Sequence, residues 1–148
     1  MNSSVELVNF RSQPDSTFVL VGCAVDLELR PKRTKGGCIY TFLLTNNGVR
    51  FEFIHRTPTP AEVYAIHDFR GMALIGVGNL LRMYDFGKKK LLAKCENRVS
   101  FSINKSRIFF HLDSPNWISL TVQKVYLQIY INYGKQICAM GLGKWASN

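Results

Sequence analysis

The residues best suited by type and spacing to do chemistry lie in a short basic and aromatic cluster, 82–90. Three consecutive lysines, Lys88, Lys89 and Lys90, follow Phe86, and Arg82 precedes them by six positions. Lysine and arginine pair with phosphate, and aromatic rings stack on bases, so this pattern indicates contact with RNA. The competing interpretation, which we favour, is a solvated turn whose lysines keep a strand edge soluble. The candidate nucleic-acid contacts are Lys88, Lys89, Lys90 and Arg82.

A second basic segment, RPKRTK at 30–35, fits an import signal or a nucleic-acid patch, and fits an exposed flexible loop better. The chain carries a net charge of +9, which favours acidic partners. Residues 98–148, however, hold 6 basic side chains and a single acid, Asp113. About half of the excess charge therefore lies outside the segment that resembles a folded scaffold, and the charge is weak evidence for nucleic-acid binding.

No pattern in the chain predicts catalysis or a bound cofactor. Gly71 and Gly76 have the spacing of a phosphate-binding loop, but Val77 follows where such a loop has Lys and Ser or Thr. The histidines, at 55, 67 and 111, lie far apart and are interpreted as ordinary strand residues. No serine lies in a G-x-S-x-G turn. We therefore predict no catalytic residue, no metal, no cofactor and no small-molecule substrate.

The cysteines and the hydropathy pattern indicate where the protein resides. Cys23, Cys38, Cys95 and Cys138 are separated by 15, 57 and 43 positions, so no C-x-x-C pair or zinc-finger spacing occurs. They are interpreted as buried thiols of a reducing compartment. The first residues lack the apolar core of a secretory signal, and no run approaches the roughly 18 apolar residues of a membrane span. We expect a nuclear or cytosolic protein with no membrane partner.

Short apolar runs separated by turn residues predict consecutive antiparallel strands. The runs cover 18–25, 38–44, 49–54, 63–69, 72–77, 80–85 and 91–95. Asn47-Gly48 predicts a type I′ turn, while Arg70-Gly71 and Gly78-Asn79 predict two further tight turns. Pro58 and Pro60 predict a sheet edge or a connection between sheets, because proline lacks the amide donor. No amphipathic helix longer than two turns is expected over 16–97.

Repeated four-stranded meanders are typical of β-propeller blades, which take about 40–45 residues each. The predicted fold is all-β: a fragment of about two blades of a propeller over 16–97, preceded by an N-terminal segment, 1–15, with room for a first strand. The remaining tail, 98–148, changes character and is assigned no fold, although the alternating pattern of 121–133 favours a strand.

At this level of detail the segment 16–97 resembles the splicing factor 3B subunit 3 family, whose wider group includes the damaged-DNA-binding adaptor and the large cleavage and polyadenylation factor subunit. The resemblance lies in FVLVGCA (18–24), GCIYTF (37–42), NG (47–48), FEFIHRTP (51–58), LIGVG (74–78) and CEN (95–97). It implies a nuclear, non-enzymatic multi-propeller scaffold of the spliceosome, with other splicing-factor 3B subunits and U2 particle components as partners and RNA contact secondary. It implies no catalytic residue.

Two alternatives accompany this interpretation. The first is a related propeller adaptor in DNA repair or ubiquitin ligation. The second is a non-functional truncated product, because residues 98–148 do not resemble the blade expected after Asn97 and have the character of translated intron or frameshifted sequence. In either case an incomplete ring leaves strand edges and apolar sheet faces uncovered, so we expect the isolated chain to associate.

Overall fold

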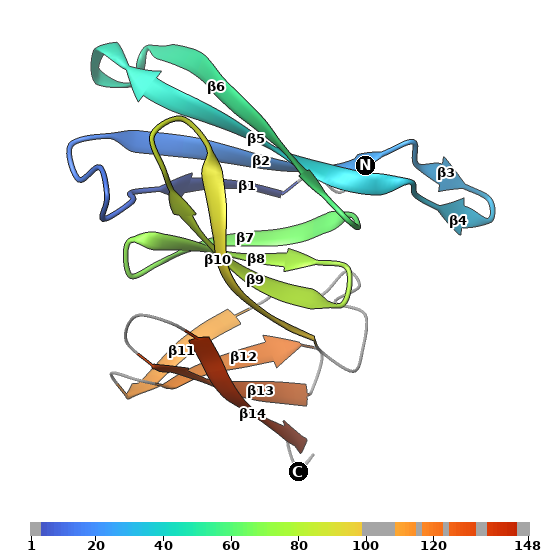
Figure 1. The fold of residues 1–148 in the computed structure, drawn as a ribbon. Helices are drawn as coiled ribbons and strands as arrows, with labels where there is room; N and C mark the ends of the chain where they lie inside the picture. The colour runs from blue at the N-terminus through green and yellow to red at the C-terminus, as the bar shows by residue number, and fades with distance from the viewer. Residues whose placement is uncertain (1–3, 99–108, 115–116, 123–124, 133–135, 145–148) are drawn as a thin grey trace.

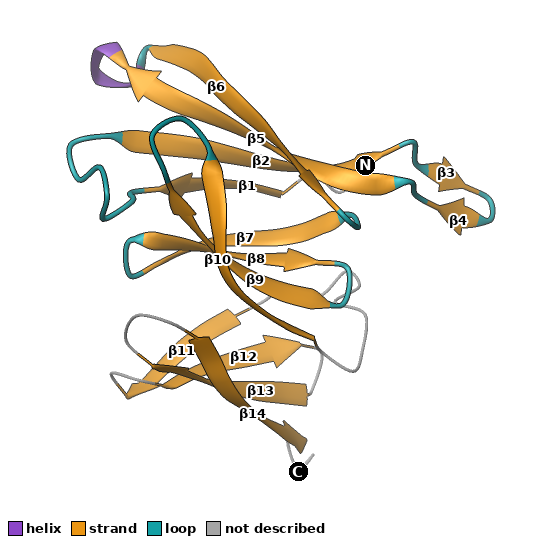
Figure 2. Cartoon of the chain, viewed as in Figure 1, coloured by secondary structure: helices purple, strands orange, loops and turns teal. Residues whose placement is uncertain are grey.

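The described part of the chain consists mainly of β-strands (Figure 1, Figure 2). The computed structural model describes residues 4–98, 109–114, 117–122, 125–132 and 136–144. Within these residues the only helical segment is a single 3-10 turn, η1, Asn46–Gly48, and no helix is long and apolar enough to cross a membrane. The strands form three four-stranded antiparallel sheets and one two-stranded hairpin. The predicted all-β class, with blade-like meanders, is confirmed.

The first sheet has the strand order β1-β2-β5-β6. Its strands are β1 Ser4–Val8, β2 Thr17–Val25, β5 Gly36–Thr45 and β6 Arg50–Thr59. Between β2 and β5 the chain forms a small hairpin, β3 Glu28–Leu29 and β4 Lys32–Arg33, which projects from the sheet (Figure 1). The sequence indicates that the basic segment 30–35 is a flexible loop, but two of its six residues, Lys32 and Arg33, form a strand that pairs with Leu29 and Glu28.

The connection from β5 to β6 differs from the predicted two-residue turn. Thr45 pairs with Arg50, which leaves four residues in the loop. Asn46, Asn47 and Gly48 have φ angles of 52°, 54° and 90°, so the left-handed backbone that the Asn-Gly pair predicts is present but extends over three residues. Two of the three are asparagines, which tolerate this conformation better than other side chains.

The second sheet has the order β10-β9-β8-β7. Its strands are β7 Val63–Phe69, β8 Met72–Val77, β9 Leu80–Phe86 and β10 Leu91–Arg98. Two-residue turns join β7 to β8 and β8 to β9, with positive φ at Arg70, Gly71 and Gly78. These are the turns that the sequence predicts. Pro58 lies in β6, the edge strand of the first sheet, where the missing amide breaks no ladder; the predicted sheet edge is confirmed.

The third sheet lies in the C-terminal part of the chain and has the order β11-β12-β13-β14. Its strands are β11 Phe109–Ser114, β12 Trp117–Val122, β13 Val125–Asn132 and β14 Gln136–Lys144. The predicted strand at 121–133 corresponds mainly to β13; its positions 123, 124 and 133 lie outside the described residues.

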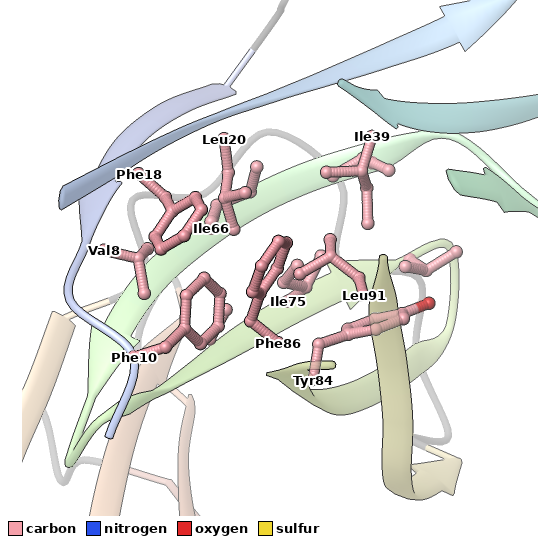
Figure 3. Close-up of a cluster of buried hydrophobic side chains, with 13 residues drawn as sticks. Val8, Phe10, Phe18, Leu20, Ile39, Ile66, Ile75, Tyr84, Phe86 and Leu91 are labelled. Atoms are coloured by element: carbon pink, nitrogen blue, oxygen red, sulfur yellow. The ribbon is translucent and has the colours of Figure 1, made fainter. Parts of the chain in front are cut away.

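The first two sheets pack face to face around one apolar core (Figure 3). Phe18 from β2 and Phe86 from β9 meet with ring centroids 4.4 Å apart, and Phe10 stacks against Phe86 at 5.6 Å. At Gly22 the sheets come so close that a Cβ atom would lie 2.4 Å from Val63 Cγ1. The absence of a side chain at Gly22 therefore lets β7 lie directly against β2.

The second sheet is buried on both of its faces. Ile75 faces the first sheet, whereas Leu74, Leu81 and Met83 face away from it and are also buried. On that side β14 of the third sheet contacts β10. The sequence of a strand that is buried on both faces is a nearly continuous apolar run, and the segment 72–77 has such a sequence.

Candidate functional site

The predicted basic cluster is a hairpin tip. Residues 87–90 connect β9 to β10, and the Gly87 N–H donates a 2.8 Å hydrogen bond to the Lys90 carbonyl. All three lysines, Lys88, Lys89 and Lys90, are exposed. At the base of the tip, the Ser12 hydroxyl donates a 2.8 Å hydrogen bond to the Phe86 carbonyl. The tip is thus held against the connection between β1 and β2, and its charges face solvent.

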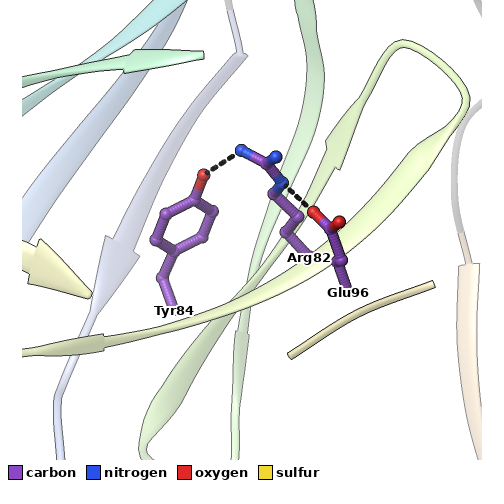
Figure 4. A network of polar contacts seen from close by, with 3 residues as sticks. All are labelled: Arg82, Tyr84 and Glu96. Carbon is purple, nitrogen blue, oxygen red and sulfur yellow. Dashed lines mark hydrogen bonds and ion pairs between the residues drawn. The ribbon is translucent and has the colours of Figure 1, made fainter. Parts of the chain in front are cut away.

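Arg82 lies elsewhere and already has partners. Its Nε is 2.8 Å from Glu96 Oε2 on β10, and its Nη1 donates to the Tyr84 hydroxyl at 3.2 Å (Figure 4). Burial alone lowers the pKa of Arg82, but the hydrogen bonds and charges of Tyr84 and Glu96 outweigh it and raise the pKa. Arg82 precedes the end of β9 by four residues, roughly 13 Å along a strand. The structure brings the three lysines together and leaves Arg82 apart; RNA contact by these residues stays a prediction.

The hairpin of β3 and β4 is tied to the junction between the sheets. Lys32 Nζ lies 3.0 Å from Glu62 Oε2 and 5.2 Å from the ring centroid of Tyr64. Hydrogen bonding to Glu62 raises the pKa of Lys32 against a smaller opposing effect of burial. Arg30 and Arg33 are exposed on the same hairpin. One lysine of the predicted basic patch is therefore structural, and two arginines remain on the surface.

The open apolar face of the first sheet was not predicted from the sequence. The strand registers place one set of apolar side chains on the side that faces away from the second sheet. This outer face comprises Val5, Leu7, Val21, Phe42, Phe51 and Phe53. Phe51 and Phe53 are 64% and 55% exposed, although Phe53 packs on Phe42 with centroids 5.8 Å apart. The sequence does show that Phe51 and Phe53 lie on one face of their strand. It does not show which face of the sheet the second sheet covers, so their exposure could not be predicted.

The outer face has the size of an interaction surface. Four strands about 4.8 Å apart and six residues long at about 3.3 Å each cover roughly 400 Å². Exposed apolar patches of a few hundred Å² on monomers are often functional. The inner face of the same sheet shows what covers such a surface in this molecule, namely another four-stranded sheet.

Residues 1–111 match the family model described as the CPSF A subunit region. The chain belongs to the CPSF A subunit region family. The match spans both of the sheets that form the core, β1 to β10. The resemblance found from the sequence motifs is thus confirmed at the level of the family.

Individual CPSF A region relatives are similar to this chain over about two thirds of its length. Splicing factor 3B subunit 3 of Danio rerio is 48% identical over 95 residues, covering 64% of this chain and 8% of the relative. Pre-mRNA-splicing factor rse1 of Emericella nidulans is 41% identical over 97 residues, covering 66% and 8%. Splicing factor 3B subunit 3 of Drosophila melanogaster is 42% identical over 96 residues, covering 64% and 8%. The chain spans about 8% of the length of these relatives.

Titratable side chains in this CPSF A region chain do not gather into a metal centre within the described residues. His55 lies on β6 with its Nδ1 3.4 Å from the Thr57 hydroxyl, and His67 lies on β7. His111 lies on β11, in the third sheet. The described histidines are strand residues of separate strands, as the sequence indicates.

Proposed function

We propose that the chain is a non-enzymatic scaffold segment in pre-mRNA splicing, acting in the nucleus with other splicing-factor 3B subunits and U2 particle components. The observation that supports this most strongly is the 41–48% identity to named splicing factors over 95–97 residues. A segment that corresponds to about 8% of such a protein supplies one part of a larger binding surface. Neither the DNA-repair adaptor nor the ubiquitin-ligation adaptor has a comparable observation in its favour.

The outer face is the part of the chain best suited to protein contact. It is apolar, lies on a sheet held rigidly by the core, and presents two exposed phenylalanines. Aromatic anchors of this kind dominate the binding energy of many protein interfaces. A partner that presents an apolar sheet face fits this surface, as the second sheet fits the inner face.

Affinity purification from nuclear extract tests this function directly. The tagged 148-residue chain and the double variant Phe51→Ser, Phe53→Ser are compared by mass spectrometry of the proteins that they recover. Val49→Ser is the matched control, because Val49 is 79% exposed but lies in the loop between β5 and β6. We expect the unmodified chain and the control to recover splicing-factor 3B and U2 components, and the double variant to lose them.

Two other outcomes contradict the proposal. Recovery of chaperones alone identifies a truncated product without scaffold function. Recovery of DNA-repair or ubiquitin-ligase subunits in place of splicing factors supports the related adaptor.

RNA contact at the hairpin tip is the secondary part of the proposal. Each phosphate contact contributes about 0.7 to the slope of log affinity against log salt for single strands. We expect the change of Lys88, Lys89 and Lys90 to alanine to reduce this slope by up to about 2 for a single-stranded RNA oligonucleotide. Arg82→Gln should have a smaller effect, because Arg82 is already paired with Glu96. An equal effect of both changes would argue against a site at the tip.

The division of the chain at residue 98 remains a proposal as well. The second sheet ends at Arg98, and we propose that 98–148 derives from translated intron or frameshifted sequence. Genomic and transcript sequences test this origin. An ordinary coding exon that runs across 98–101 and is shared by longer relatives would overturn it.

A further inference from the structure

Two cysteines lie directly opposite each other in the first sheet. Cys23 on β2 is the cross-strand partner of Cys38 on β5, and both thiols are free. The register places them on the same side of the sheet as Val21 and Tyr40, which is the side of the outer face. Cys38 is buried, whereas Cys23 is partly exposed. One thiol of the pair is therefore open to a reagent in solution.

The distance between facing strand positions suits a disulfide. Residues directly opposite in an antiparallel pair have Cα atoms about 4.5–5.5 Å apart, and disulfides join Cα atoms about 4.4–6.8 Å apart. The two thiols also interact: burial raises the pKa of Cys23, and the neighbouring charge of Cys38 and a hydrogen bond with it raise that pKa further. The register therefore allows the bond to close without separation of the strands.

We propose that Cys23 and Cys38 form an oxidation site that takes a small-molecule disulfide, such as oxidised glutathione, as its co-substrate and closes an intrachain disulfide between β2 and β5. The Cys23 thiolate attacks one sulfur of the small disulfide, forms a mixed disulfide and releases one small thiol. Cys38 then attacks the Cys23 sulfur and releases the second small thiol. Two protein S–H bonds are lost and one S–S bond forms, while the small disulfide is reduced to two thiols.

The surroundings of the pair determine its pH dependence. The groups that face the pair are Tyr40 on β5 and Arg56 on β6, and the neighbouring Cys38 raises the pKa of both. The pKa of Cys23 lies above its ordinary 9.0, chiefly because of burial. Since the thiolate is the attacking species, the rate of mixed-disulfide formation rises with pH and is still rising at pH 9.0. The pair therefore reacts slowly with small disulfides at neutral pH, and faster as the pH rises.

Peptide mapping after oxidation tests the site in the unmodified chain. The chain is incubated without denaturant with oxidised glutathione, alkylated and digested with trypsin. Cys23 and Cys38 fall in different tryptic peptides, because Lys35 lies between them. We expect these two peptides to be joined by a disulfide that dithiothreitol releases, and the chain to stay a single covalent monomer.

Two variants separate the steps. With Cys38→Ala, glutathione should remain attached to Cys23, because nothing displaces it. With Cys95→Ser and Cys138→Ser together, the joined peptides should form as in the unmodified chain. The proposal is overturned if glutathione persists on Cys23 in the unmodified chain, if Cys23 or Cys38 is joined to another cysteine instead, or if neither thiol reacts until the chain is denatured.

Discussion

A pair of phenylalanine substitutions distinguishes the covered face of the first sheet from its open face. Phe18 is 1% exposed and packs against Phe10 and Phe86, whereas Phe51 is 64% exposed on the outer face. A buried phenylalanine removes roughly 150–250 Å² from water, which at about 25 cal/mol per Å² is worth roughly 4–6 kcal/mol. Replacing such a side chain with alanine typically costs about 3–5 kcal/mol, because a cavity remains.

We therefore expect Phe18→Ala to destabilise the chain by about 3–5 kcal/mol and Phe51→Ala by about 1–2 kcal/mol at most, since only a third of its area is covered. A domain of about 95 residues has a total stability of about 5–14 kcal/mol, so the first change removes a large share of it. With a urea slope of about 2 kcal/mol/M, the unfolding midpoint should fall by roughly 1.5–2.5 M for Phe18→Ala and by under about 1 M for Phe51→Ala.

Urea unfolding followed by circular dichroism measures both midpoints, and sedimentation at the same concentration gives the association state. Equal shifts for the two variants would refute the one-sided burial of the first sheet. If the Phe51 variant were also the less associated of the two, the outer face would be covered by another copy in solution, as expected for an apolar face without a partner. Phe18 and Phe51 are the same residue type on the same sheet, so the comparison isolates burial.

Three further predictions concern single residues. Lys32→Met leaves the Glu62 carboxylate, which is 5% exposed, without its cation and should reduce the free energy of unfolding by about 1–3 kcal/mol. Lys35→Met breaks the pair of Lys35 and Asp26, whose side chains are 79% and 60% exposed, and should change the urea midpoint little. Burial lowers the pKa of His67 from the usual 6.5, so that as the pH falls the unfolded chain takes up a proton before the folded chain does. The contribution of His67 to the free energy of unfolding should therefore be full above pH 6.5 and decline below it. His67→Gln should flatten that decline. Gly22→Ala places a methyl group 2.4 Å from Val63 Cγ1 on β7 and should reduce the free energy of unfolding by about 1–3 kcal/mol, as overpacking a core does. The thermal midpoint should fall accordingly, and an unchanged midpoint would contradict the close sheet contact.

Local rules of sequence account for most of the strands. The apolar runs and the Arg70-Gly71 and Gly78-Asn79 turns depend on neighbouring residues, so the meander of the second sheet was predictable strand by strand. The family was predictable because its motifs stand in order along 16–97. Features that depend on register were not predictable, because register depends on partners far away in the sequence.

The outer face and the cysteine pair show this limit. A β-bulge between Thr41 and Phe42 shifts the pairing of β6, so that Phe53 and Arg56 lie on one side of the sheet although three positions separate them. An even alternation would place them on opposite sides. Likewise, nothing near Cys23 in the sequence indicates that Cys38 is its neighbour across the sheet.

The order of the sheets along the chain also has a consequence for protein synthesis. The first sheet is complete at Thr59, but the strands that cover Phe18 and Leu20 end only at Arg98. At about 5–20 residues per second, a ribosome needs roughly 2–8 s to make the missing 40 residues or so. During that interval only β7, complete at Phe69, and the strands that follow it can begin to cover the inner face, and afterwards only the outer face is open. The speed of translation therefore sets how long a chaperone has to capture the nascent chain by its inner face.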